Sequence, residues 1–222
     1  MADYTSAYTQ EDVRAVGGVS TAKLVGQVMF LVAVAIGFLA VGTWIGRDLS
    51  MGTARICSFA GLGMLLIASF GPRFFRVGAF AIGWLYALAL MIGLGLGPVI
   101  AYFSAVNESA LTQAAGGTAL TVVGMGALGF VMSKDLAPWM RPLSIVVLVA
   151  VVISIVALVA GGAGTLSPII SLVIFAASAL LIMVDFNYLR KHATEDDVVW
   201  LATGIFVSIV NIFISLLNLF SD

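Results

Sequence analysis

The residue with the clearest chemical potential in this sequence is Asp185, which directly follows the apolar run Leu180-Leu181-Ile182-Met183-Val184. Ser171 and Ser178 precede it at intervals of seven, so these three side chains share one face of a helix. An ionisable side chain in so apolar a stretch marks a candidate functional site. Depending on whether an arginine reaches it, the acid can be ionised or protonated, and in either state it could sense pH or bind a cation.

A second polar stripe lies near the end of the chain. It is formed by Ser208, Asn211, Ser215 and Asn218, whose spacing of three and four residues places them on one helix face, opposite a face of Ile, Phe, Val and Leu. The two stripes could line one interior seam, with Asp185, Ser208 and Asn211 as its ion-binding or pH-sensing residues. Alternatively, each polar group only bonds a neighbouring helix, for about 0.6–2 kcal/mol.

A buried acid calls for a search for counter-ions among the arginines. Arg55 is expected near the outer end of the second predicted helix, whereas Asp185 is expected near the inner end of the sixth. Arg73, Arg76 and Arg190 are expected at the same depth as the acid. Arg73, Arg76 or Arg190 is therefore the candidate counter-ion of Asp185.

The composition defines the environment of these side chains. Of the 222 residues 62% are hydrophobic and only 9% are charged, against roughly 25% charged residues in a soluble domain. Such a chain cannot cover itself with a water-facing surface, and its apolar stretches recur with only short polar breaks. The sequence predicts an all-α integral membrane protein folded as one bundle. Its single cysteine, Cys57, excludes an intramolecular disulfide.

A membrane helix needs about 20 mostly apolar residues, and cutting the sequence at charges, prolines and glycine clusters leaves seven such stretches. They are 25–46, 54–71, 77–103, 110–132, 143–161, 166–189 and 198–220. Continuous apolar runs of this length fit helices rather than the alternating strands of a barrel. The prediction is a bundle of seven transmembrane helices over residues 25–220, preceded by a polar amino-terminal segment, residues 1–24.

Lysine and arginine predict the orientation of this bundle, because cytoplasmic loops are enriched in them. If the amino terminus is cytoplasmic, the inner segments hold Arg14, Lys23, Arg73, Arg76, Lys134, Arg141, Arg190 and Lys191. The outer side then holds only Arg47 and Arg55. We therefore expect a cytoplasmic amino terminus and an external carboxyl terminus.

Glycines cluster in the third and fourth predicted helices, at Gly93-Leu94-Gly95-Leu96-Gly97-Pro98 and at Gly116-Gly117-Thr118, followed by Gly124, Gly126 and Gly129. Small residues at these spacings let helix backbones approach closely. The alternative is that the glycines and Pro98 break a helix to line a polar path.

An enzyme is not expected from this sequence. His192 stands alone, Cys57 is remote from it, and neither a phosphate-binding glycine loop nor a Ser/His/Asp set is found. His192 is expected in a solvated loop. We predict no cofactor, apart from calcium as a transported ion, and no nucleic-acid partner; membrane lipids surround the helices.

Near its end the sequence reads Ala202-Thr203-Gly204-Ile205-Phe206-Val207-Ser208-Ile209-Val210-Asn211-Ile212-Phe213-Ile214-Ser215-Leu216-Leu217. This stretch resembles the final helix of the Bax inhibitor family. The resemblance extends to Ala114-Ala115-Gly116-Gly117-Thr118-Ala119-Leu120, Ser133-Lys134-Asp135, Val184-Asp185-Phe186 and, more weakly, Leu96-Gly97-Pro98. It is greatest to the YccA branch of bacterial inner membranes.

This resemblance implies a seven-helix fold in which an acid of the sixth helix pairs with one of the seventh as a pH-responsive latch on a calcium leak. Asp185 matches the first acid, but Ser208 stands at the position of the second. The YccA branch likewise has serine there, and the resemblance to it implies restraint of the membrane protease FtsH, engaged through a cytoplasmic amino terminus such as Met1 to Ser20.

The sequence thus predicts a regulator of an FtsH-type protease in membrane-protein quality control. The alternative is a pH-sensitive calcium or cation leak in which Asp185 gates and Ser208 and Asn211 supply neutral ligands. A third interpretation is a packing scaffold for other membrane proteins.

Overall fold

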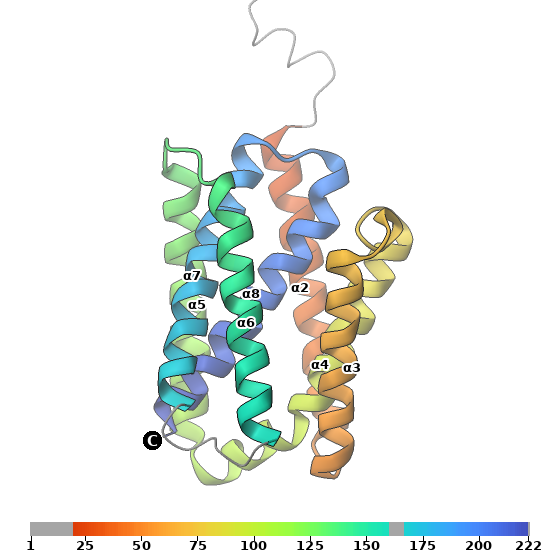
Figure 1. Cartoon of the computed structure of the whole chain (residues 1–222), viewed down its shortest axis with the longest axis vertical. Helices are drawn as coiled ribbons and strands as arrows, with labels where there is room; N and C mark the ends of the chain where they lie inside the picture. The colour runs from red at the N-terminus through yellow and green to blue at the C-terminus, as the bar shows by residue number, and fades with distance from the viewer. Residues whose placement is uncertain (1–19, 160–166, 222) are drawn as a thin grey trace, which may run out of the picture.

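The computed structural model describes residues 20–159 and 167–221, and in these ranges the chain is helical, without strands. Seven helices are long and apolar enough to cross a membrane (Figure 1). They are α2 (Thr21–Gly46), α3 (Met51–Phe70), α4 (Ala79–Val106), α5 (Glu108–Val131), α6 (Met140–Val159), α7 (Ser167–Lys191) and α8 (Val198–Phe220). The predicted fold class and the predicted seven helices are confirmed.

The first helix begins earlier than the hydropathy pattern indicates. Ser20 has an extended backbone, and its hydroxyl accepts a hydrogen bond from the backbone N–H of Lys23 at 3.3 Å. This N-cap starts the helix at Thr21, because a serine side chain satisfies an N–H of the first turn. The helix therefore begins four residues before the predicted stretch 25–46; residues 1–19 lie outside the described ranges.

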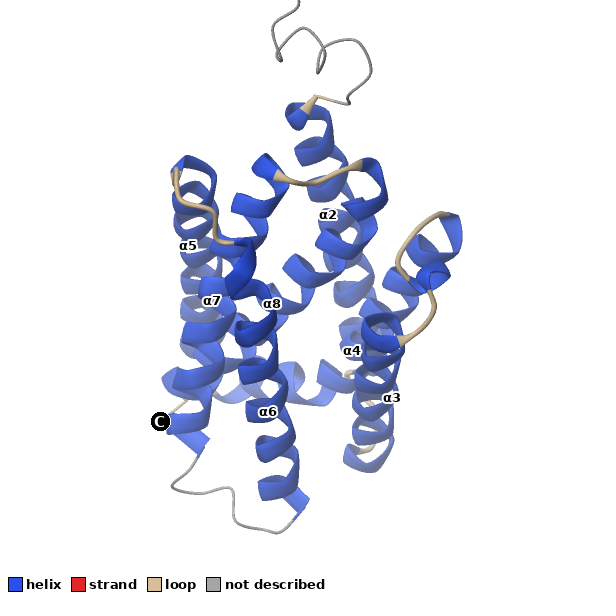
Figure 2. Cartoon of the chain, turned by 45° about the horizontal axis from the view of Figure 1, so that its top comes forward, coloured by secondary structure: helices blue, strands red, loops and turns tan. Residues whose placement is uncertain are grey.

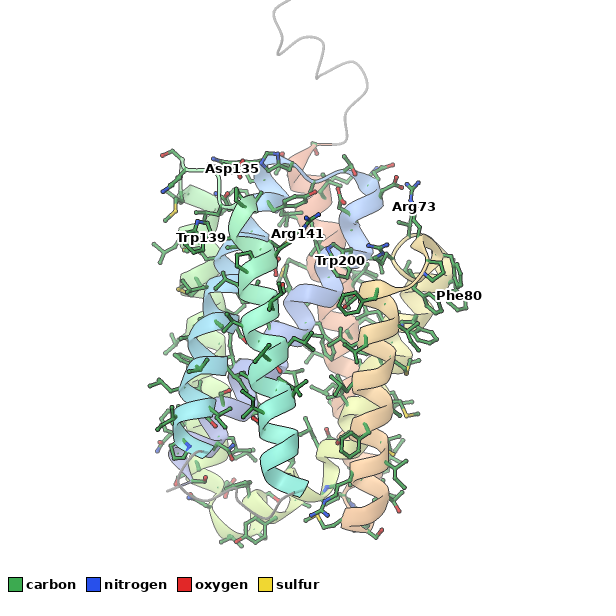
Figure 3. The ribbon with its side chains drawn as sticks, viewed as in Figure 1. Arg73, Phe80, Asp135, Trp139, Arg141 and Trp200 are labelled. Carbon is green, nitrogen blue, oxygen red and sulfur yellow. The ribbon has the colours of Figure 1, made fainter. Side chains whose placement is uncertain are left out.

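The helices run alternately up and down, because short connections join each to the next. Figure 1 shows α2 starting at one end of the bundle and α8 finishing at the other. Basic side chains gather toward the end where α2 starts, and Figure 3 shows Arg73 and Arg141 on that half of the bundle. Of the described basic residues, only Arg47, just after α2, and Arg55, in the first turns of α3, lie toward the opposite end of the bundle.

Helix α8 occupies the centre of the bundle. Its Leu201, Ile205, Phe206 and Ile212 are almost completely buried, and it packs against α7, α5 and α2. By contrast, α3 packs chiefly on α4, and α6 chiefly on α7, so both lie at the periphery (Figures 1 and 2). The large apolar side chains exposed on the peripheral helices face the region that lipid would occupy.

Helices α2 and α4 touch at their backbones. A Cβ atom on Gly42 would lie 2.5 Å from the carbonyl oxygen of Leu90, and one on Gly46 would lie 2.5 Å from that of Leu94. On the facing side, Gly93 and Gly97 would place a Cβ against the α2 backbone. Glycines four apart on both helices therefore allow this approach, and the packing interpretation of the third-helix glycines is confirmed.

The alternative interpretation of this segment, a broken helix lining a polar path, is not observed. Helix α4 stays continuous through Pro98, which is buried, and ends only at Val106. Its last turns run across the lower end of the bundle to α5 (Figure 1).

The glycines of α5 differ in their surroundings. A Cβ atom on Gly129 would overlap the backbone of Met183 on α7, whereas one on Gly116 or Gly124 would have no neighbour within 4 Å.

The α2–α4 contact leads to a matched pair of substitutions on one helix. Gly42→Ala should lower the free energy of unfolding by about 1–3 kcal/mol, because the new methyl group overlaps backbone atoms that cannot move alone. Gly37→Ala should not lower it, because nothing lies within 4 Å of that Cβ position. Unfolding in mixed detergent micelles measures both, and equal effects would contradict the backbone contact.

Candidate functional site

Asp185 lies about two turns from the end of α7 and is buried, with 5% of its surface exposed. Its carboxylate points toward α8 at Gly204, where an added Cβ would lie 3.5 Å from Oδ2. Within residues 20–159 and 167–221, no ion pair or hydrogen bond reaches this carboxylate. The site therefore consists of a carboxyl group held between two apolar helices, close to the α8 backbone.

A second contact between α7 and α8 shows that the two predicted polar stripes face each other. The amide Nδ2 of Asn218 donates a hydrogen bond to the Ser171 hydroxyl at 3.3 Å. Asp185 follows Ser171 by the same number of residues as separates Gly204 from Asn218. The antiparallel register is thus constant over four turns, which places Ser178 level with Asn211.

We call this line of polar residues the α7–α8 seam: Ser171, Ser178 and Asp185 on α7, and Gly204, Ser208, Asn211, Ser215 and Asn218 on α8. Ser208 is buried one turn beyond Gly204, and Asn211 is half-buried. The hydroxyl of Ser178 is buried, with no hydrogen-bond partner in the described part of the chain. The two predicted stripes therefore do form one seam, in which the Asn218–Ser171 pair makes the hydrogen bond between α7 and α8 seen among the described residues.

The predicted counter-ions bind other groups. Arg73 pairs with Asp196 of η3 (Glu195–Asp197). Arg76 donates to the Gly71 carbonyl oxygen at 3.4 Å, with its guanidinium 5.9 Å from the Trp200 ring centre. Arg190 donates to the carbonyl oxygen of Met132 at 2.7 Å.

The prediction that Arg73, Arg76 or Arg190 neutralises Asp185 is therefore wrong for this structure. Five residues separate Arg190 from Asp185, and at about 3.6 residues per turn this places the two side chains roughly 140° apart around α7. The other two arginines belong to the connection between α3 and α4. They are held at the surface of the bundle by η3 and by that connection itself.

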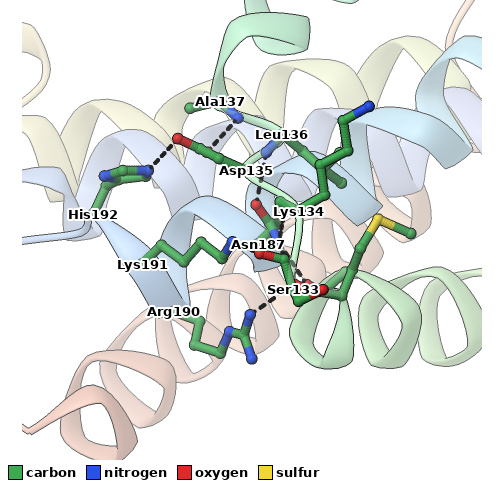
Figure 4. Close-up of polar contacts among 11 residues, drawn as sticks. Ser133, Lys134, Asp135, Leu136, Ala137, Asn187, Arg190, Lys191 and His192 are labelled. Carbon is green, nitrogen blue, oxygen red and sulfur yellow. Dashed lines mark hydrogen bonds and ion pairs between the residues drawn. The ribbon is translucent and has the colours of Figure 1, made fainter.

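Asn187 anchors the end of α7 to the end of α5, a role that the sequence reasoning missed (Figure 4). Its side chain is completely buried. The amide nitrogen lies 3.1 Å from the carbonyl oxygens of Gly129, Met132 and Lys134, and the amide oxygen accepts from the backbone N–H of Leu136 at 2.9 Å. One amide thus satisfies the backbone groups freed where α5 ends. The feature of the sequence that could have indicated this role is an asparagine in an apolar stretch, two residues after Asp185.

Charged residues complete this junction. Lys191 donates to the Ser133 carbonyl oxygen, and the His192 ring lies 3.0 Å from the Asp135 carboxylate (Figure 4). The pKa of Asp135 is lowered below its usual range, chiefly because the backbone N–H of Ala137 and then the His192 ring bond the carboxylate. The expected loop position of His192 agrees with its exposure at this end.

Seven helices long enough to span a membrane, together with a buried acid in a polar seam, define a multi-pass helical membrane protein. Compared with models of known protein families, residues 21–222 match the family described as inhibitor of apoptosis-promoting Bax1. Because the match covers most of the chain, the protein belongs to this Bax inhibitor family.

The capping role of Asn187 yields a direct test. Asn187→Leu keeps the side-chain size but leaves buried carbonyl groups without donors, so it should lower the free energy of unfolding by about 1–3 kcal/mol. The matched control is Asn218→Leu, which removes a single bond of 3.3 Å and should have the smaller effect. The free energy of unfolding of both variants, measured in detergent, tests this. A smaller decrease for Asn187→Leu than for Asn218→Leu would contradict the anchoring role of Asn187.

Proposed function

We propose that this protein is an inner-membrane regulator of an FtsH-type ATP-dependent protease, acting in the quality control of membrane proteins. The observation that carries the proposal is Ser208, which is buried in the α7–α8 seam and leaves Asp185 as the seam's only carboxyl group. The two-acid latch of the leak mechanism needs a second acid there. The serine is instead the feature shared with the YccA branch, for which protease restraint is the implied role.

The position of the amino terminus supports this proposal. Helix α2 starts at the end of the bundle that carries Arg73 and Arg141 (Figure 3), and α7 ends there with Arg190 in its last turn. Under the positive-inside rule this end faces the cytoplasm of a bacterium. The polar residues 1–19 are joined to it, on the side where the ATPase part of such a protease would grip a segment.

Deletion of residues 2–19 tests the proposal, because it removes the polar segment but keeps the Ser20 cap of α2. Full-length protein should lengthen the half-life of a membrane-bound FtsH substrate in cells and co-purify with the protease, and the deletion should lose both effects. The matched control is deletion of Ser221-Asp222 at the opposite end, which should change neither. Unchanged restraint by the shortened chain, present at equal membrane levels, would contradict the proposal.

The second candidate function is a cation leak, and the observation that favours it is the buried Asp185 carboxyl group without an ion-pair partner in the described residues. An unpaired carboxylate within a membrane helix is costly and marks a candidate site on an ion pathway. Asn211 and Ser208 would supply neutral oxygens along the same seam, and hard cations such as calcium prefer oxygen ligands.

Calcium flux into liposomes containing the purified protein, measured from pH 6 to 8, tests this second candidate. If the seam conducts, flux should depend on pH, and Asp185→Asn should abolish that dependence. Asp135→Asn is the control, because this acid is exposed in the loop at the end of α5 and should leave flux unchanged. Flux no greater than that of empty liposomes would remove the leak hypothesis without affecting the protease proposal.

A further inference from the structure

A groove separate from the seam lies among α2, α4, α5 and α8. Its volume is about 600 Å³, which is within the range of ligand sites. Along α2 it extends from Ile36 to Arg47, and its far wall includes Ile209 and Phe213 of α8. It exists because Gly46 and Gly97 hold α2 against α4 while α5 stays farther away.

The length of the groove matches one leaflet of a bilayer. Ile36 and Arg47 are eleven residues apart, which at 1.5 Å per residue is roughly 16 Å along the helix. Half of a hydrocarbon core of about 30 Å is about 15 Å. The groove therefore runs from the level of the lipid headgroups, at Arg47, to the middle of the membrane.

The wall of the groove is apolar even where hydroxyl groups line it. Each of its three hydroxyl side chains donates to a backbone carbonyl of its own helix: Thr43 at 2.9 Å, Ser104 at 2.8 Å and Thr118 at 2.7 Å. The remaining lining side chains, apart from Arg47, are apolar or aromatic. The wall thus fits a hydrocarbon chain.

The headgroup end of the groove carries a cation. The guanidinium of Arg47 lies 5.5 Å from the ring centre of Trp44, and both residues line the groove. Its Nε donates to Asp48 at 3.2 Å in an exposed ion pair, which stabilises little. The two terminal nitrogens make no hydrogen bond within the described residues, and a guanidinium binds phosphate well.

We propose that this groove is a phospholipid site: one acyl chain lies along α2 from Arg47 to Ile36, and the lipid phosphate binds the Arg47 guanidinium. The occupant is a phospholipid of the leaflet on the Arg47 side. The proposal is independent of protease restraint and of cation leak, because it uses none of the α7–α8 seam.

Native mass spectrometry of the full chain, released from detergent after titration with palmitoyl-oleoyl phosphatidylglycerol, tests this site. Arg47→Gln should weaken binding of the first lipid about tenfold, the effect of losing a charged hydrogen bond. Arg55→Gln should leave binding unchanged, because Arg55 is exposed at the same end of the bundle but does not line the groove. Diacylglycerol with the same chains, which lacks the phosphate, should bind the native protein as weakly as phosphatidylglycerol binds Arg47→Gln.

A second pair of variants tests the acyl-chain part of the site. Ala40→Phe fills the groove and should also weaken binding, whereas Ala33→Phe, on the same helix but outside the groove, should not. Glycerol phosphate alone should not compete, since it has no chain. Equal losses for Arg47→Gln and Arg55→Gln, or unchanged binding in both Arg47→Gln and Ala40→Phe, would overturn the proposal.

Discussion

The close approach of α2 and α4 is the constraint on which the arrangement of the other helices depends. In lipid, apolar side chains gain little by turning from hydrocarbon toward another helix, so van der Waals packing and polar contacts decide which helices associate. Gly42 and Gly46 meet Gly93 and Gly97 at backbone distance, and larger side chains would separate the two helices. Helix α3 packs on the α4 side of this pair, and α8 packs against α2 as well as against α7 and α5.

Polar groups within the bundle follow two opposite patterns. Asn187 is completely buried and its amide lies within hydrogen-bonding distance of four backbone groups around the end of α5, as expected where no water can replace a missing partner. Asp185, only two residues earlier on α7, has no partner among the described residues although it is almost as buried. A structural group and a candidate functional group are thus distinguished by their hydrogen bonds rather than by their burial.

The protein has two chemically different candidate sites, one inside the bundle and one in a groove beside α2. The α7–α8 seam is an interior line of hydroxyl and amide groups ending near a carboxyl group, and both candidate functions depend on Ser208 or Asp185 within it. The groove beside α2 is apolar along its length and cationic at one end. Their separation means that lipid binding and events in the seam can be measured independently.

The sequence by itself determined the class of the protein and the number of its helices, because a bilayer of fixed thickness requires about 20 apolar residues per helix. It also determined that Ser171, Ser178 and Asp185 share one face, since the helical period is a local property. Only the tertiary structure decided what each face meets. Arg190 turns to Met132 rather than Asp185, Asn187 caps α5, and the groove opens at Arg47. These outcomes depend on the rotation and register of neighbouring helices, which packing between segments distant in the chain determines and which no single stretch of sequence encodes.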